Sequence, residues 1–472
     1  MRQRVAVAVL GVLVVISLVR YTRALPDPAF LDFRAFYCGA QALVQHGDPY
    51  RVEPLRTCER TPSRLRLWTS RGQVVPVPLP PLTLALFGLL LPLGFDGASL
   101  VWLVLLVASL VFAVIALART YGVAAWRIAT LFALPLAAVS FALGQLAPIV
   151  VAVIAAAAWA LQRRRDALAG GALVLTLVEP HVGAAACVAA FALVRGTRLP
   201  LATGVCVAAA ASWWLFGTNG LRAYVTHVLP DAARANVADP FNYGLAPLLR
   251  EAGLSERAAL GAGDVSYAVM LVAGSVLALR LLRRGERTAP AIIPPALVLI
   301  GGPYIHISQM AIALPALVWL MTRAPRAPTT AVASVALGVP WLEAAASSFL
   351  VVPATLAAGI VSRVRSQRDA TTLATMTVVA VLTFGLSAIV QLRGAPPHHP
   401  QALPAMAPGE SAEQAWGDEV RAHPLDVALF TAIKLPTWIG LLALAAGVWQ
   451  AGSTDAEPRG ALEQPRLQAR DA

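Results

Sequence analysis

The sequence predicts an all-α polytopic membrane protein, a helical bundle with about 11–13 transmembrane helices and outward-facing loops. Of its 472 residues, 58% are hydrophobic and only 13% are charged, whereas soluble domains carry roughly 25% charged residues. The apolar residues also come in runs long enough to cross a hydrocarbon core about 30 Å thick, which takes roughly 20 residues of helix. A water-soluble globule is therefore not expected.

The net charge of +12 reflects membrane topology rather than binding to nucleic acid. Arginines cluster in short bridges between apolar runs, at residues 163–165, 195–198, 283–284, 323–326 and 363–368. Because cytoplasmic loops are enriched in basic residues, we expect these bridges in the cytoplasm. The outer loops are then residues 20–76, 217–264 and 393–424 of a single membrane domain covering residues 1–450. Residues 451–472 are expected to form a disordered cytoplasmic tail.

The first apolar run, residues 5–19, is expected to be an uncleaved span, because no small-residue cleavage site follows it. Counting crossings from a cytoplasmic N-terminus places Arg119 and Arg127 on the wrong side of the membrane. The parity is restored if one run does not cross the membrane fully, and the proline-rich run 77–93 is the one we expect to do so, although the count alone leaves the point open.

Three apolar segments are predicted to reverse inside the protein, at residues 144–145, 178–181 and 301–306. Glycine or proline interrupts the helix at each of these points. The arms around the last two have about 12 residues each, too few for a straight crossing. With the arginine bridges in the cytoplasm, all three reversals face outward.

Polar side chains gather at the outer level that these reversals share: Asp32, Gln145, Glu179, His181, His306 and Gln309. Polar and ionisable residues inside a membrane are rare, and each is by default a candidate functional residue. We therefore expect a single polar cavity that faces outward. The alternative for Glu179 and His181 is a structural pairing with each other, and for His306 a hydrogen-bonded place on an apolar helix.

Asp32 is the best candidate for a general base, because burial beside a cavity raises the pKa of a carboxyl towards the working pH. Its position before a helical stripe of apolar residues also fits an N-cap, and the two roles can coexist. The sequence Gly47-Asp48-Pro49-Tyr50 predicts the end of this helix and a turn. Cys38 and Cys58 fall in the same outer loop, where either a disulfide or two free thiols are compatible with the sequence.

Motifs for nucleotide hydrolysis are missing, since the sequence contains neither a phosphate-binding Gly-Lys loop nor a dinucleotide-binding glycine pattern. Energy for any reaction must then come from the substrates or from a gradient. A secondary transporter is one alternative, because broken helices with polar residues at depth also build transport sites. A lipid-binding or flipping protein without transferase activity is another.

The ordered motifs of the chain resemble glycosyltransferase family 87 over residues 31–320. The resemblance is carried by the string from Leu31 to Tyr50, by Leu79-Pro80-Pro81-Leu82, by Leu143-Gly144-Gln145 and by Glu179-Pro180-His181. This family consists of polyprenyl-phosphate-sugar-dependent transferases of the GT-C fold, including mannosyltransferases that elongate phosphatidylinositol mannosides. It usually has lysine where Glu179 stands, and the exchange inverts a charge that would face a lipid phosphate.

The resemblance implies a hexosyltransferase of glycolipid biosynthesis in the cell envelope, located in the plasma (inner) membrane with its active site facing outward. It implies transfer of a hexose, with mannose expected, from a polyprenyl-phosphate donor to a lipid or glycan acceptor, and it assigns the general base to Asp32. Membrane lipids are the other expected partners. A divalent metal is a candidate cofactor, with Glu179 as its one candidate ligand. The substrate-binding candidates are Tyr37, Tyr50, Gln145, Glu179, His181, Asn242, Tyr304, His306 and Gln309.

Overall fold

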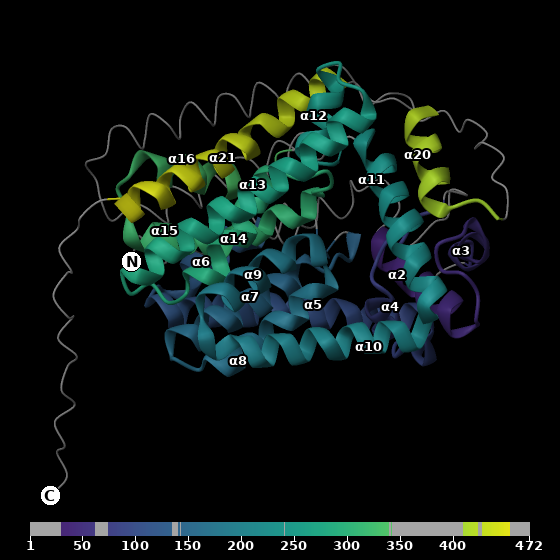
Figure 1. Cartoon of the computed structure of the whole chain (residues 1–472), viewed down its shortest axis with the longest axis horizontal. Coiled ribbons are helices and arrows are strands. Elements are labelled where there is room, and N and C mark those ends of the chain that lie inside the picture. The colour runs from purple at the N-terminus through teal and green to yellow at the C-terminus, as the bar shows by residue number, and fades with distance from the viewer. Residues whose placement is uncertain are drawn as a thin grey trace, which may run out of the picture.

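The computed structural model describes residues 30–61, 74–134, 140–141, 143–239, 241–338, 341, 409–422 and 427–453. Within these residues the chain folds into helices, and its β-structure is limited to two isolated bridges (Figure 1). The predicted all-α membrane class is therefore confirmed.

Four helical segments of the described chain are long and apolar enough to cross a membrane: Pro81–Tyr121, Arg195–Val237, Glu256–Arg283 and Ile433–Ser453. They contain the longest helices, α5 (Gly94–Tyr121), α10 (Arg198–Ala223), α13 (Glu256–Arg283) and α21 (Val427–Ser453). Large apolar side chains cover the outside of these helices. Trp214 on α10, for example, is 81% exposed, as expected for a surface that meets lipid.

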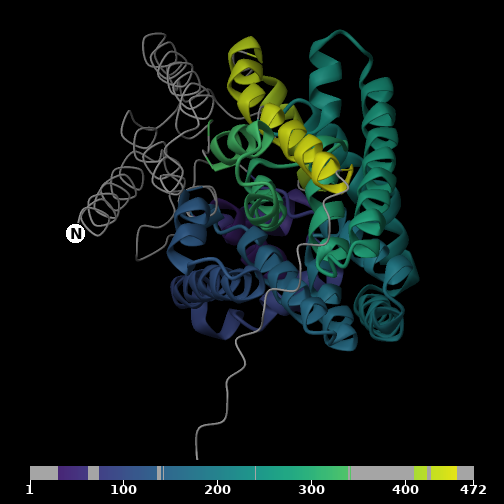
Figure 2. The same cartoon turned by 90° about the vertical axis from the view of Figure 1, so that its left-hand side faces the viewer.

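The shorter helices of the bundle are α7 (Ala147–Gln162), α8 (Asp166–Val174), η3 (Leu175–Val178), α9 (Pro180–Leu193), α14 (Ala289–Leu297), η6 (Val298–Ile300), η7 (Ile307–Ala313), α15 (Leu314–Arg323) and α16 (Pro328–Gly338). Every residue of α14 is buried, although the helix contains Pro294 and Pro295. Helix α21 crosses the bundle beside α13 and α16, so the end of the described chain packs against its middle (Figure 2).

Two of the predicted reversals are visible in the contacts between their arms. Around Glu179, the thiol of Cys187 donates to the carbonyl of Leu173, which pairs α9 with α8 in opposite directions. Around residues 301–306, the Arg323 guanidinium lies 2.7 Å from Glu286, which brings the far ends of that pair of arms together. The third interruption falls at Gly144, whose φ of 73° ends the preceding helical segment before α7 begins.

The arginine bridges at residues 163–165, 195–198, 283–284 and 323–326 lie at one end of the bundle, and the bridge at 363–368 lies outside the described residues. Arg287 donates to the carbonyl of Leu161 at 3.0 Å and pairs with Asp166 at 2.7 Å. Arg284 donates to the carbonyl of Ala451 near the end of α21. Helices α2 (Leu31–Val44), α3 (Val52–Glu59) and α20 (Ala412–Ala422) lie at the opposite end (Figure 1).

The run at residues 77–93 does not cross a membrane as a helix of its own, which agrees with the parity argument. Helix α4 (Pro81–Gly88) has 8 residues and is about 12 Å long, far less than the hydrocarbon thickness. The turn η1 (Leu91–Leu93) then leads into α5. The first run, residues 5–19, and the tail from residue 454 lie outside the described residues.

The segment predicted as the second outer loop folds mainly as helices. Helix α10 continues through a kink at Gly217 (φ 64°) and is followed by the π-helical turn η5 (Tyr224–Val228). Two short helices, α11 (Leu229–Val237) and α12 (Leu245–Glu251), complete it before α13 begins.

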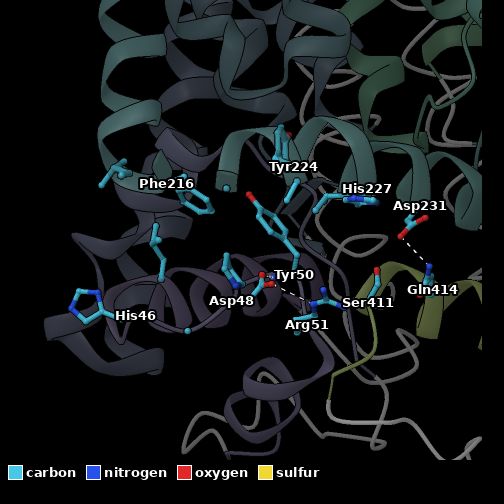
Figure 3. A pocket seen from close by; sticks show the side chains of 17 residues that line it. His46, Asp48, Tyr50, Arg51, Phe216, Tyr224, His227, Asp231, Ser411 and Gln414 are labelled. Atoms are coloured by element: carbon cyan, nitrogen blue, oxygen red, sulfur yellow. Dashed lines mark hydrogen bonds and ion pairs between the residues drawn. The ribbon is translucent and has the colours of Figure 1, made fainter. Parts of the chain in front are cut away.

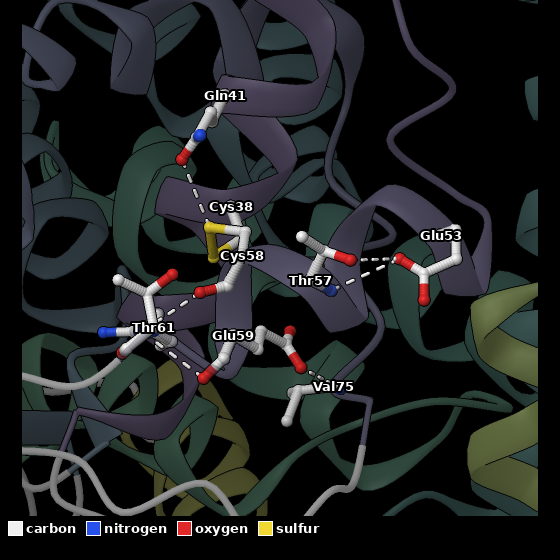
Figure 4. The surroundings of a disulfide bond; sticks show 9 residues. Cys38, Gln41, Glu53, Thr57, Cys58, Glu59, Thr61 and Val75 are labelled. Carbon is white, nitrogen blue, oxygen red and sulfur yellow. Dashed lines mark hydrogen bonds between the residues drawn. A yellow bond between two sulfur atoms is a disulfide. The ribbon is translucent and has the colours of Figure 1, made fainter.

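A disulfide between Cys38 and Cys58 joins α2 to α3, with Cα atoms 5.6 Å apart (Figure 4). Beside it, the buried guanidinium of Arg34 donates to the carbonyls of Cys58 and Glu59 at 3.1 and 3.3 Å, and also to that of Thr61. These bonds make α2 and α3 one unit, which fixes the helix that carries Asp32.

Candidate active site

Asp32 lies in the first turn of α2 and does not cap it. The helix begins at Leu31, and Phe30, in a left-handed conformation with φ 64°, is its N-cap. The expectation of an Asp32 N-cap is therefore wrong. A carboxylate in the first turn is still favourable, because the free N–H groups and the helix dipole present partial positive charge there.

Gly144 brings the second member of the site, Gln145, against α2. A Cβ added at Gly144 would lie 2.6 Å from the Cβ of Phe33, and the indole of Trp102 donates to the Gly144 carbonyl at 2.8 Å. This close approach lets the Gln145 side-chain amide donate to the Asp32 carboxylate. The loop and the helix thus form one acid–amide pair.

The pKa of Asp32 is raised to about 7. Burial of the carboxyl is the main cause, since it penalises the charged form. The hydrogen bond from Gln145 opposes this effect, and the negative charge of Asp239 adds to it. Asp32 therefore titrates close to neutral pH.

The reversal at residues 301–306 supplies a second set of polar groups. Gln309 accepts the backbone N–H of His306 at 2.7 Å through its side-chain oxygen. The amide nitrogen of the same side chain lies 2.5 Å from the Nε2 of His181. The rings of His181 and Tyr304 stand 5.3 Å apart. Gln309 thus joins the reversal at 301–306 to the start of α9.

Glu179 lies between the acid–amide pair and this second set. Its side chain is 3% exposed, and its Oε2 has no hydrogen-bond partner within the described part of the chain. It interacts with Gln309 and with the charge of Asp32, and Tyr304 in turn interacts with the charges of Asp32, Asp239 and Glu179. The predicted residues Asp32, Gln145, Glu179, His181, Tyr304, His306 and Gln309 therefore form one polar cluster.

The side chain of Asn242 bonds to the backbone segments that surround this cluster. Its side chain donates to the carbonyls of Asn236 and Pro303 at 2.9 and 3.1 Å and accepts the N–H groups of Gly244 and Ile305 at 2.8 and 3.0 Å. These four bonds tie residues 236–244 to the reversal at 301–306. Both amide hydrogens of the Asn242 side chain are donated to backbone carbonyls, so neither is available to a ligand.

Two residues of the cluster were missing from the sequence prediction, Asp239 and Lys434. Asp239 is 5% exposed, and burial raises its pKa to about 6 against the opposing effects of the Phe241 N–H and of Lys434. Lys434 comes from α21, is almost fully buried and donates to the carbonyl of Asn242 at 2.9 Å. It is the only lysine of the chain, and this singularity within an apolar run was the signal that could have revealed it.

Two predicted substrate-binding residues lie apart from the cluster. The ring of Tyr37 packs against Phe33 and Phe95, at centroid distances of 6.4 and 5.6 Å. The hydroxyl of Tyr50 donates to the carbonyl of Leu79 at 3.0 Å, and its ring lines a separate pocket.

No group of three histidine, cysteine, aspartate or glutamate side chains in the described ranges is arranged to hold a metal ion. Within the polar cluster, Glu179 offers one carboxylate oxygen without a hydrogen-bond partner. The described side chains of the cluster therefore do not supply the set of oxygen ligands that a divalent metal needs.

The fold and the cluster define a membrane protein with a polar centre of carboxylates, amides and imidazoles. Residues 79–300 match the model of glycosyltransferase family 87. This match, over slightly less than half of the chain, supports membership of that family, which the sequence motifs resemble, and with it the function of a membrane glycosyltransferase. No curated protein and no solved structure gives a significant match. The matched segment contains Gln145, Glu179 and His181, whereas Asp32 and Lys434 lie outside it.

Proposed function

We propose that the protein transfers a hexose, with mannose expected, from a polyprenyl-phosphate donor to a hydroxyl of a lipid or glycan acceptor on the extracytoplasmic face. The observation that carries this proposal is the Asp32 carboxyl, which Gln145 orients and whose pKa of about 7 suits a general base.

In this reaction Asp32 takes the proton of the acceptor hydroxyl while the oxygen attacks the anomeric carbon of the donor. The new bond joins that carbon to the acceptor oxygen. The bond from the carbon to the phosphate oxygen breaks, and the polyprenyl phosphate leaves with the electron pair. Asp32 then returns its proton to water. The donor carries its own activated leaving group, which agrees with the missing nucleotide-binding motifs.

The departing phosphate needs hydrogen-bond donors and positive charge. We assign these to His181, His306, Gln309 and Lys434. Lys434 acts electrostatically on His306 and on Asp239, and its ammonium has three donors, of which one is bound to the Asn242 carbonyl. A cation from α21 would thus offset the negative charge that Glu179 brings where the family usually has lysine.

The proposal is tested with membranes that contain the protein and a polyprenyl-phosphate donor with radiolabelled mannose. We expect lipid-linked or glycan product from wild type and a loss of at least about a hundredfold in Asp32→Asn, as is usual for removal of a general base. Asp418→Asn is the matched control, since Asp418 is exposed and pairs with Arg421 on α20. Equal transfer by wild type and Asp32→Asn would refute the assignment of the base.

The same membranes also test the alternative functions, a secondary transporter and a lipid-flipping protein. Solute flux or lipid flipping, without transfer from any polyprenyl-phosphate sugar, would favour a secondary transporter or a flipping protein.

A further inference from the structure

A pocket of about 590 Å³ lies at the end of the bundle that carries α2, away from the acid–amide pair (Figure 3). Its walls come from the turn that follows α2, from α10 on both sides of its kink at Gly217, from η5 and the start of α11, and from the start of α20. The residues that matter for its chemistry are Tyr50, Arg51, Phe216, Tyr224, Asp231 and Gln414.

Two exposed tryptophans place this pocket at the level of the membrane–water interface. Trp213 and Trp214, which are 57% and 81% exposed, stand on α10 within one turn of the pocket residue Phe216. Tryptophan is enriched where a membrane protein passes from lipid to water. A ligand of this pocket therefore reaches it from the headgroup region.

The charges around the pocket are paired. Arg51 and Asp48 lie 3.3 Å apart, Asp231 pairs with Arg234 at 2.5 Å, and the Gln414 amide donates to Asp231 at 3.1 Å. The carboxylates of Asp48 and Asp231 would repel an anionic ligand. An alkyl chain is also unfavourable, because it would remove both carboxylates from water without replacing their hydrogen bonds to water. A neutral ligand that both donates and accepts hydrogen bonds fits this lining.

Three aromatic side chains, Tyr50, Phe216 and Tyr224, line the pocket beside aliphatic and glycine residues. The hydroxyls of Tyr50 and Tyr224 donate to the carbonyls of Leu79 and Pro78, each at 3.0 Å, so their polar ends are already bound. Their rings lie 5.5 Å apart, and Phe216 packs on Tyr50 at 6.1 Å. Flat apolar faces beside paired polar groups suit the alternating C–H and hydroxyl surface of a carbohydrate.

We propose that this pocket binds the carbohydrate part of the acceptor, at a distance from the reacting hydroxyl. Asp32 lies at the start of α2 and the pocket begins directly after its end, and 14 residues of helix separate the two by about 20 Å. One sugar ring cannot cover that length. The inference rests on the proposed transferase function and adds that the acceptor carries a chain of several sugars.

The test measures binding of linear mannotetraose and of methyl mannoside to the purified full-length protein in nanodiscs. His227, which is exposed and lines the pocket, is replaced by tryptophan to fill it. Val225→Trp is the matched control, because Val225 is 60% exposed on the same turn and does not line the pocket. Gln414→Leu removes one amide without adding bulk.

We expect wild type and Val225→Trp to bind mannotetraose alike and at least tenfold more tightly than methyl mannoside. His227→Trp should lose that tenfold preference, and Gln414→Leu should weaken tetraose binding several-fold. Equal tetraose binding by wild type and His227→Trp, or competition by inorganic phosphate, would overturn the inference. Tetraose binding without sugar transfer would refute the proposed reaction alone, and transfer without tetraose preference would refute the pocket alone.

Discussion

Replacement of Gln145 by leucine should move the pH dependence of sugar transfer upward. The Gln145 amide donates to the Asp32 carboxylate and so stabilises the charged form of the base. With a pKa of about 7, roughly one tenth of Asp32 is ionised at pH 6 and roughly nine tenths at pH 8. The kcat/KM of wild type should therefore rise about tenfold between these two pH values.

The size of the upward shift follows from the strength of the lost bond. A hydrogen bond to a charged group contributes about 1.5–3 kcal/mol, and one pKa unit corresponds to about 1.4 kcal/mol. Because Asp32 as a whole residue is only half-buried, the lower end of this range applies. We expect the midpoint in Gln145→Leu to lie about one unit above that of wild type.

Asp239→Asn provides the opposite perturbation of the same group. The negative charge of Asp239 raises the pKa of Asp32, so its removal should move the midpoint to lower pH. The assay is the initial rate of transfer from labelled donor at low acceptor concentration, measured from pH 5.5 to 9. Asp32→Asn should show no such midpoint. Shifts in the same direction for Gln145→Leu and Asp239→Asn would refute the reasoning.

Three further perturbations test the surroundings of the site. Cys38→Ser opens a disulfide that closes a separation of 20 residues, so it should cost about 3 kcal/mol and lower the melting temperature in detergent, as reductant should in wild type. Gly144→Ala forces a Cβ against Phe33 and should destabilise by about 1–3 kcal/mol, whereas Gly261→Ala, which meets open space, should not. Gln309→Leu should lower kcat about tenfold and leave the pH midpoint unchanged in the same transfer assay.

The order of helices was predictable because membrane helices are specified locally. A membrane helix can be predicted from an apolar run and the arginines that flank it, without information on distant residues. Proline or glycine in the sequence marks the position of each helix interruption. The same local chemistry predicted the turn at Asp48, where the Tyr50 N–H binds the aspartate side chain at 2.9 Å. The prediction that Asp32 is the N-cap of α2 was wrong, because the left-handed conformation of Phe30 depends on packing that the local sequence pattern does not encode.

The composition of the site was only partly predictable, since its residues come from six separate segments. Gln145, Glu179 and Gln309 could be predicted as site residues, because each is a polar residue beside a helix interruption that the sequence shows. Whether such groups meet depends on how the arms pack. Asp239 and Lys434 are about 200 positions apart in the chain, and nothing in either neighbourhood predicts that the charge of one acts on the other.

The use of a single lysine in a chain with 36 arginines has a physical reason that can be tested. An ammonium is compact and keeps donors free after one bond, whereas a planar guanidinium is larger and needs several partners. Lys434 is almost fully buried with one bond to the Asn242 carbonyl. If it holds the donor phosphate, Lys434→Met should raise the KM for the donor about tenfold or more and leave the pH midpoint of Asp32 near 7. Lys434→Arg keeps the charge but overfills the site, and should not restore the wild-type KM. An unchanged donor KM in Lys434→Met would show that this cation serves only to hold the Asn242 backbone.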